Sequence, residues 1–153
     1  MSKLMRADPA DYAFLAGLMH DIGELVLLER SATLGGITPQ MVSDPDAGPV
    51  IRATITRLHT ELGAAVCRIW KLPPSVIDSA LFHHNCRRGE KRFLTTALVA
   101  ASDHITDSMG LGETPRTLDP SDSLFTDLRL SPEQVKGIVA ETEKTLPALA
   151  VGH

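Results

Sequence analysis

The sequence predicts an all-α fold, a bundle of about five to six helices formed from 153 residues. Three observations lead to this prediction. Apolar residues recur at helical spacing in successive segments, no segment alternates apolar and polar residues as a strand does, and capping residues stand where helices would begin. With this length and 43% hydrophobic residues, one domain with a substantial core is expected.

The first helix is expected to begin at Asp8, whose side chain can cap the helix, with Pro9 at the first helical position. Its wide apolar stripe indicates a helix largely surrounded by protein. The stripe consists of Phe14, Leu15, Leu18, Met19, Ile22, Leu25 and Val26. The helix is expected to continue to about Leu28, and residues 31–48, rich in Gly, Asp and Pro, to form a loop.

A second helical region is expected from about Val50 to Lys71, with a break near His59 as an alternative, because Thr60 could cap a new turn. Its predicted buried face consists of Leu62, Ala65, Val66, Ile69 and Trp70. The run Leu72-Pro73-Pro74 ends this region and starts the next helix. The stripe of that helix consists of Val76, Ile77, Ala80, Leu81 and His84.

The last third of the chain predicts two more helices joined by a long connection. Residues 87–90 are expected to form a turn, and a helix follows from about Lys91 to Met109. Residues 110–130 are polar and contain proline, which is typical of a connection. Ser131-Pro132-Glu133-Gln134 matches a capping box, so a final helix should cover roughly residues 132–146.

The composition excludes several classes of partner. A formal charge of −4 provides no field that would attract nucleic acid or an anionic membrane surface. No apolar run reaches the ~20 residues of a membrane span, and the first residues do not form a signal peptide, so the cytoplasm is the expected location. Cys67 and Cys86 fit neither a disulfide framework nor a Cys-x-x-Cys zinc motif, and both are expected to be reduced thiols.

Six residues with metal-binding side chains lie among aliphatic residues, where a core helix rarely tolerates them without a reason. They are His20, Asp21, His59, His83, His84 and Asp103. They come from four segments, and ligands must converge from several elements to surround an ion. Imidazole and carboxylate ligands suit iron, manganese, zinc or magnesium. The sequence therefore predicts a divalent metal site, with enough ligands for one ion and some to contribute to a second.

Each of these residues also has an ordinary structural explanation. A single His on a helical stripe is more often a hydrogen-bonded core residue than a ligand. Asp103 could cap a helix or pair with an Arg, and His83 with His84 could mark a fraying helix end. His104 has no partner in the pattern and is assigned a structural role.

Four motifs, in their order along the chain, resemble the HDOD domain, a relative of the HD superfamily of metal-dependent phosphohydrolases. The motifs are Phe14-Leu-Ala-Gly-Leu-Met-His-Asp-Ile-Gly23, His59-Thr-Glu-Leu-Gly63, Trp70-Lys-Leu-Pro73 and Ala80-Leu-Phe-His-His84. Asp103 occupies the position of the closing aspartate of the superfamily. The resemblance covers about Asp11 to Asp107 and implies an HD-domain-like helical fold.

The chain also departs from the superfamily pattern. HD enzymes carry another metal-binding His on a helix before the His-Asp pair, but no His precedes His20. A full HDOD domain has an N-terminal helical half that is missing here, so the resemblance is to the C-terminal part of such a domain. In the related HD-GYP phosphodiesterases a Lys follows the His-Asp-Ile-Gly run, but Glu24 stands here and cannot neutralise a substrate phosphate. Instead of a Gly-Tyr-Pro element, Arg87 and Arg88 follow the double histidine as weak candidates for phosphate binding, since paired Arg residues in a turn are usually only solvated.

The resemblance implies two functions. The favoured one is a signal-transduction adaptor, regulatory rather than catalytic, which acts through contacts with a signalling protein or by self-association and keeps a degenerate HD metal site. It predicts an exposed apolar surface, with the first helix as the main contributor. The alternative is a metal-dependent phosphohydrolase acting on a nucleotide or cyclic dinucleotide through a metal-bound hydroxide. A metal-free cluster of hydrogen-bonded His and Asp residues is a variant of the first reading.

Overall fold

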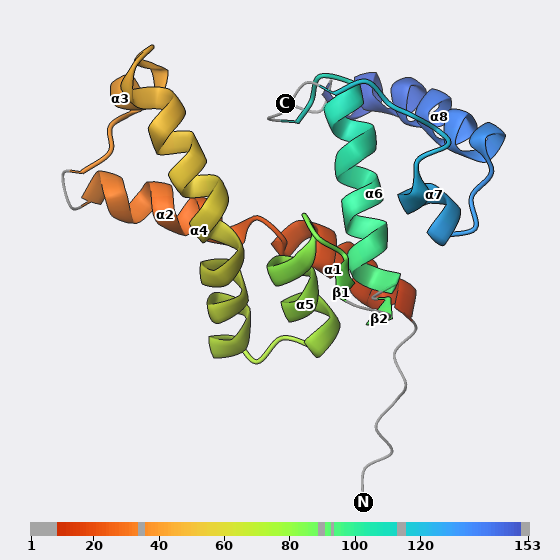
Figure 1. The fold of residues 1–153 in the computed structure, drawn as a ribbon, viewed down its shortest axis with the longest axis horizontal. Helices are drawn as coiled ribbons and strands as arrows, with labels where there is room; N and C mark the ends of the chain where they lie inside the picture. Colours follow the sequence, from red (N-terminus) through yellow and green to blue (C-terminus); the bar gives the residue numbers. More distant parts are fainter. Residues whose placement is uncertain (1–8, 34–35, 89–90, 93, 113–115, 151–153) are drawn as a thin grey trace, which may run out of the picture. The chain divides into compact units, whose positions relative to one another are not determined.

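The computed structural model describes residues 9–33, 36–88, 91–92, 94–112 and 116–150. The chain forms two compact units, one that ends at Val99 and one that begins at Ala100. Helices dominate both units (Figure 1), and the all-α prediction is confirmed. The one pair of strands in the described residues is a two-residue antiparallel ladder of β1 (Arg87–Arg88) and β2 (Lys91–Arg92), close to the expected turn.

The first unit begins with two helices where the sequence predicted one. α1 (Pro9–Met19) and α2 (Ile22–Thr33) are separated at His20 and Asp21, so the prediction of a continuous helix is wrong. The carbonyl oxygen of Asp21 accepts a hydrogen bond from the N–H of Glu24 at 2.9 Å, which forms the first turn of α2. The apolar spacing runs through both helices and therefore conceals the break. The expected cap at Asp8 lies outside the described residues.

The expected loop contains a short helix and the start of a long one. α3 (Pro39–Ser43) is capped by the hydroxyl of Thr38, which accepts from the N–H of Met41 at 3.2 Å. Five residues are too few to show a helical apolar period, which is why this helix was missed. α4 (Ala47–Ile69) follows at once, and the carboxylate of Asp44 accepts from the N–H of Ala47 at 2.8 Å in its first turn.

α4 is continuous, without the alternative break near His59, and its buried face differs from the predicted one. The buried row steps four residues at a time, through Ile55, His59, Gly63 and Cys67, with Ala64 beside it. Ile69 and Trp70, which were predicted to be buried, are 75% and 57% exposed. The prediction followed the largest apolar side chains, whereas the close packing of α4 uses its smallest ones.

A Schellman motif ends α4 and turns the chain into α5 (Pro74–Phe82). The N–H of Leu72 donates to the carbonyl of Cys67, and the N–H of Lys71 to that of Arg68, both at 3.0 Å. Lys71 adopts the left-handed conformation that this motif requires, with φ of 56°. α5 ends at Phe82, with His83 as its C-cap, so His84 lies beyond the helix and not on its stripe as predicted.

The core of the first unit is made of small and medium-sized side chains. Its buried cluster consists of Ala16, Met19, Ala64, Cys67, Val76, Ala80 and Val99. α2 and α5 both pack against α4, and α1 packs against α5. Such packing leaves much of α1 uncovered, since Phe14 is 80% and Leu18 67% exposed. The expectation that the first helix is largely surrounded by protein is therefore wrong.

The second unit contains most of α6 (Leu94–Ser108), together with α7 (Ser123–Asp127) and α8 (Pro132–Ala150). α7 lies in the predicted connection and, like α3, has only five residues. The predicted capping box is confirmed: Ser131 N–H donates to Gln134 Oε1 at 2.8 Å, and Gln134 N–H to Ser131 Oγ at 3.3 Å. None of the described helices combines the length and apolarity needed to cross a bilayer.

Candidate metal centre

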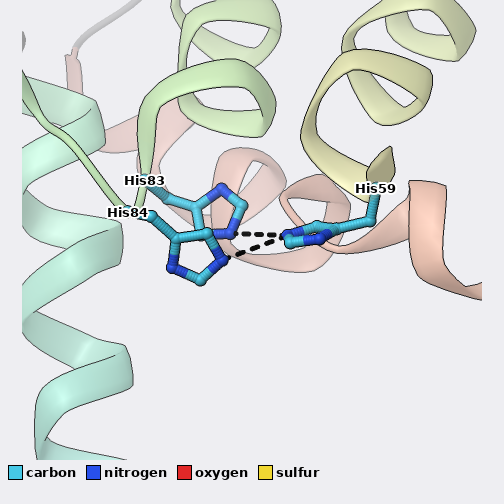
Figure 2. A group of neighbouring side chains, drawn as sticks. All are labelled: His59, His83 and His84. Carbon is cyan, nitrogen blue, oxygen red and sulfur yellow. Dashed lines mark hydrogen bonds between the residues drawn. The ribbon is translucent and has the colours of Figure 1, made fainter. Parts of the chain in front are cut away.

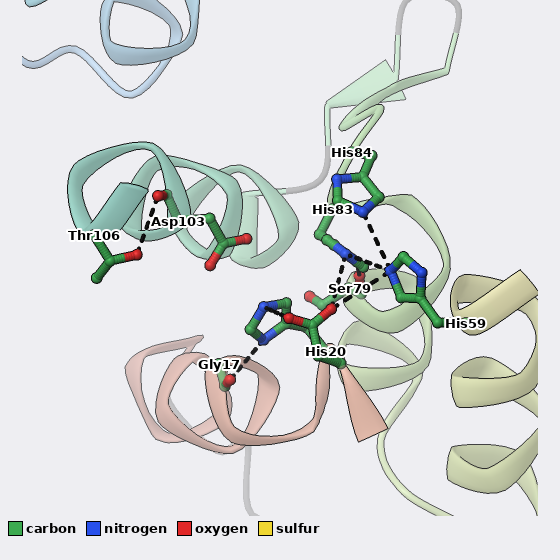
Figure 3. Close-up of polar contacts among 9 residues, drawn as sticks. Gly17, His20, His59, Ser79, His83, His84, Asp103 and Thr106 are labelled. Atoms are coloured by element: carbon green, nitrogen blue, oxygen red, sulfur yellow. Dashed lines mark hydrogen bonds and ion pairs between the residues drawn. The ribbon is translucent and has the colours of Figure 1, made fainter. Parts of the chain in front are cut away.

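Five of the six predicted ligands come together in the first unit, from three places in the chain. His20 and Asp21 form the junction between α1 and α2, which frees both side chains from a continuous helical surface. His59 lies on the buried row of α4. His83 caps the C-terminal end of α5 and His84 follows it, so two neighbouring imidazoles face the same centre (Figures 2 and 3).

Three of these side chains form a compact triangle of ligand atoms. The Nε2 atoms of His59 and His83 are 3.2 Å apart. Asp21 Oδ1 lies 3.3 Å from His83 Nε2 and 3.5 Å from His59 Nε2. We call these three residues the triad. Its members belong to three different elements, so the triangle exists only when the helices are packed.

The two remaining histidines flank the triad. His84 Nε2 lies 3.2 Å from His59 Nε2 (Figure 2). His20 Nε2 lies 2.8 Å from Asp21 Oδ2, the carboxylate oxygen that is not part of the triangle. His84 can therefore add a fourth ligand to the triad, while His20 holds the second oxygen of the carboxylate.

The backbone fixes the orientation of three of the imidazole rings (Figure 3). In each case the Nδ1 atom contacts a carbonyl oxygen one turn earlier: His20 that of Gly17 at 2.7 Å, His59 that of Ile55 at 3.1 Å, and His83 that of Ser79 at 3.0 Å. A carbonyl oxygen only accepts, so Nδ1 must carry the proton and donate it. In the neutral ring, Nε2 then carries a lone pair, and it is Nε2 that points into the site.

With this tautomer, the centre of the triad contains lone pairs but no proton between them. Two Nε2 lone pairs and a carboxylate oxygen face one another, and neutral rings of this tautomer contribute no proton to the contacts between them. The side chains of His59 and His83 are only 4% and 1% exposed, so water offers them little compensation. Such an arrangement calls for a positive charge at its centre, which either added protons or a metal ion can supply.

The electrostatics keep the carboxylate charged. Burial raises the pKa of Asp21, but hydrogen bonds and charge interactions with His20 and His83 outweigh it, and the pKa lies well below its usual range. Partial burial, together with the neighbouring imidazoles of His83 and His59, lowers the pKa of His84 to about 4. Asp21 is therefore ionised and His84 neutral near pH 7, which are the states in which they bind metals.

The distances suit a coordination sphere. For metal–ligand bonds of about 2.1 Å, two ligand atoms lie about 3.0 Å apart at a right angle and about 3.4 Å apart at a tetrahedral angle. The triad edges and the contact of His84 with His59 fall between 3.2 and 3.5 Å. The cluster contains two overlapping sets of potential metal ligands, and both include His83: one set is His59, His83 and His84, and the other is His20, Asp21 and His83. A neutral ring offers one lone pair, so His83 can serve only one ion.

The site is closed on one side and open on the other. His59 and His83 are buried, and the side chain of His20 is 17% exposed. The Asp21 side chain, in contrast, is 49% exposed, and His84 is also exposed. Solvent or a small anion can therefore approach along the side that Asp21 and His84 border.

The roles of the remaining predicted site residues, Asp103, Arg87 and Arg88, stay predictions. Asp103 lies on the part of α6 that belongs to the second unit, where its carbonyl accepts from the hydroxyl of Thr106 at 3.1 Å. Its role as a ligand stays a prediction. The side chains of Arg87 and Arg88 lie outside the described part of the structure, so their phosphate binding also stays a prediction.

Two glycines close to the cluster were quoted as parts of motifs without any role. Gly23 follows the His-Asp pair by two residues, and Gly63 follows His59 by one helical turn. Their buried positions place the two helix backbones in contact. The signal that could have identified them is their spacing from the predicted ligands, since a glycine on the packing face of a helix permits close approach.

The chain matches a known protein family. The profile of the HDOD domain matches residues 1–86, more than half of the chain. The chain belongs to the HDOD family. The matched segment includes five of the six predicted ligands and ends before Asp103, so it is shorter than the expected range of Asp11 to Asp107 and occupies the N-terminal part of the chain.

A relative from Treponema pallidum (strain Nichols) is 28% identical over 132 residues, which cover 85% of this chain and 26% of that protein. The chain thus spans about a quarter of the length of this relative. The relative is described as an uncharacterized protein, so its name assigns no activity. No solved structure shows a significant match to this HDOD chain.

Proposed function

We propose that this HDOD chain is a regulatory signalling module that binds one divalent metal ion and acts through protein–protein contacts. The observation that carries the metal site is the convergence of two buried, backbone-oriented Nε2 atoms on an ionised carboxylate. A polar cluster of this kind, without a positive charge at its centre, would have unfavourable electrostatics in a buried position.

The triad of Asp21, His59 and His83 would hold the ion, with His84 as the fourth ligand. His20 carries a proton on Nδ1, which donates to Gly17, and would need a second proton on Nε2 to donate to the other oxygen of the carboxylate. In that form it would orient the carboxylate and keep it in place when the site is empty. Three imidazole nitrogens and one carboxylate oxygen favour zinc or ferrous iron over magnesium, which prefers oxygen ligands. A structural or regulatory role needs no more than this set.

The adaptor part of the proposal is supported by the uncovered face of α1. Phe14 and Leu18 are one turn apart and largely exposed, and Leu25 on α2 is 63% exposed. Side chains of this size on a surface are typical of sites that bind another protein. The partner would be a signalling protein or a second copy of this chain, and metal binding would stabilise the junction from which α1 extends.

A metal-dependent phosphohydrolase is the second candidate, and the open side of the site favours it. A bound metal would polarise a phosphoryl oxygen and lower the pKa of bound water. Asp21 and His84 border that side, so a phosphoryl group could reach the bound ion there. Glu24 counts against an anionic substrate because it places a negative charge three residues after Asp21.

The test begins with the metal content of protein purified without chelator, compared with that of Asp21→Asn and His83→Ala variants and of His104→Ala as a matched control. The proposal expects about one equivalent of zinc or iron in the wild type and in the control, and none in the triad variants. Hydrolysis of a generic phosphodiester that is lost in the same variants would select the hydrolase. Metal-free wild-type protein at saturating zinc would overturn the metal site.

The adaptor part has its own test. Substituting Phe14 and Leu18 with Ser should weaken self-association or capture of the partner without changing the metal content. If the wild type is monomeric at high concentration and no protein partner competes for this face, the adaptor proposal fails.

A further inference from the structure

We propose that Gly23 is a positioning residue for the metal centre: it sets the separation between α2 and α4, and so the distance between the His20–Asp21 junction and His59. This inference rests on the proposed metal function, because it concerns the geometry of the same ligands. Gly23 bears no ligand atom itself. Its contribution is the room that its missing side chain leaves between two backbones.

The close approach of the two helices is visible at Gly23. A Cβ atom at this position would lie 2.0 Å from the carbonyl oxygen of His59 and 2.6 Å from the backbone nitrogen of Gly63. Both atoms belong to the backbone of α4, so no rotation of a side chain can relieve the overlap. Any other residue at position 23 must push α2 and α4 apart or distort one of them.

The atoms of α4 that contact Gly23 belong to one turn of that helix. The carbonyl oxygen of His59 and the nitrogen of Gly63 lie at the two ends of the turn that begins at the His59 ligand. On the other side of this contact, a Cβ at Gly63 would lie 3.3 Å from the nitrogen of Gly23 and 3.6 Å from the carbonyl oxygen of His20. The glycine pair therefore touches the backbone of His59 and the backbone of His20.

This arrangement links the helix separation directly to the triad. Asp21 immediately precedes α2, whereas His59 lies on α4, so the 3.5 Å contact of Asp21 Oδ1 with His59 Nε2 spans the two elements. The contact of His59 with His83 joins α4 to α5 and does not involve α2. Separating α2 from α4 should thus remove the carboxylate from the metal centre while leaving the two imidazoles together.

Three glycine-to-alanine variants form a graded test. Gly23→Ala introduces the severe overlap, Gly63→Ala a mild one, and Gly137→Ala none, because nothing lies within 4 Å of a Cβ at Gly137. All three glycines are helical, so the change in helix propensity is similar in each variant and favours folding. Differences in metal affinity among them therefore report on the space between the helices.

The measurements are the affinity for Zn²⁺, in competition with a chromophoric chelator, and the helical content by circular dichroism. We expect Gly137→Ala to bind like the wild type, Gly63→Ala to bind up to about tenfold more weakly, and Gly23→Ala at least about a hundredfold more weakly. Equal affinities in all three folded variants would overturn the inference. If Gly23→Ala does not fold, Gly63→Ala decides: unchanged affinity contradicts the proposal, and weaker binding with native helicity supports it.

A second readout separates failure of this inference from failure of the proposed function. Long-range ¹H–¹⁵N spectra of the metal-free protein report the ring nitrogens of His20, His59 and His83 directly. Wild-type protein that binds no Zn²⁺ would refute the metal function alone. The positioning role would still be supported if Gly23→Ala shifts the ring signals of His20 and His59 while Gly137→Ala does not, and it would be overturned if neither variant shifts them.

Discussion

The histidines of the first unit and His104 of the second unit look alike in the sequence, but their surroundings differ. In the first unit, the Nε2 atoms of His59 and His83 face the carboxylate of Asp21. In the second unit, His104 Nε2 contacts the guanidinium of Arg116, and the ring packs edge-on against Phe125 at 6.5 Å between centroids. In the first unit, the negatively charged carboxylate of Asp21 faces imidazole nitrogens. In the second unit, the permanently positive guanidinium of Arg116 faces an imidazole nitrogen.

This difference separates a histidine that can bind metal from one with a structural role. Arg116 can only donate, so it satisfies the lone pair of His104 and would repel a metal ion from it. Burial, followed by the charge of Arg116, lowers the pKa of His104 and keeps the ring neutral. What decides the role of an imidazole is therefore the group that faces Nε2, and not the apolar residues around it in the sequence.

The largest expected effect comes from exchanging the two kinds of histidine for alanine. His83→Ala removes a ligand that both groups of potential metal ligands share, and we expect its affinity for Zn²⁺ to fall by more than about a hundredfold. His104→Ala should leave the affinity unchanged. Isothermal titration calorimetry of both variants measures this contrast, and similar losses in the two would contradict the distinction between the sites.

Metal binding should also stabilise the first unit selectively. A ligand at about 100 times its dissociation constant stabilises the folded state by about 2.7 kcal/mol, which corresponds to a rise in Tm of roughly 5 to 10 °C. Thermal unfolding with Zn²⁺ and with excess chelator measures this shift. Asp21→Asn should show no shift, because the carboxylate that completes the triad is lost, and an equal shift in this variant would place the ion elsewhere.

The pH dependence of the metal-free protein should reveal His84. Its pKa is lowered to about 4 in the folded state by partial burial and by the facing rings of His83, His59 and His20, which outweigh the opposing charge of Asp21. The unfolded chain therefore takes up this proton first, near pH 6.5, and stability should fall as the pH drops from about 6.5 to 4. Asp21, with its lowered pKa, keeps its stabilising charge throughout this range.

Urea unfolding in the presence of chelator, repeated across this pH range, measures the slope of the free energy of unfolding against pH. We expect the slope to be smaller in His84→Gln than in the wild type. A slope that is the same in both proteins would mean that other groups dominate the acid response.

The smallest expected effects come from two helix ends of the same kind, one in each unit. Lys71 after α4 and Arg129 after α7 both adopt left-handed backbone conformations, with φ of 56° and 60°, within Schellman hydrogen bonds. Glycine adopts this conformation without cost, so Lys71→Gly and Arg129→Gly should each stabilise by about 1 kcal/mol. If the units unfold separately, each variant should raise only its own calorimetric transition, whereas a shared rise would indicate one cooperative unit.

The sequence predicted which side chains come together better than it predicted their helical setting. His20, Asp21, His59 and His83 were identified because polar, metal-binding side chains are costly in apolar segments, and this reasoning does not depend on helix boundaries. The break at His20–Asp21 was missed, since apolar residues recur at the same spacing on both sides of it. A periodic pattern reports that helices are present, but not that the axis changes direction between two of them.

The buried face of α4 shows a second limit of sequence reasoning. Ile69 and Trp70 were expected to be buried because they are large and apolar, but α4 packs through Gly63, Ala64 and Cys67. Helix–helix distance is set by the smallest residues at the contact, and their role becomes visible only when the partner helix is known. For the same reason Gly23, although part of a quoted motif, received no role.

The anchoring of the imidazole rings by main-chain oxygens has a consequence for release of an ion. No substitution of a neighbouring side chain can remove these acceptors, since every residue at positions 55 and 79 supplies a carbonyl. Unwinding of the helix can remove them, and the last turn of α5, which His83 caps, is where unwinding costs least. A protein that captured this turn in an extended form would thereby discharge the metal, and restoring the turn would reload it.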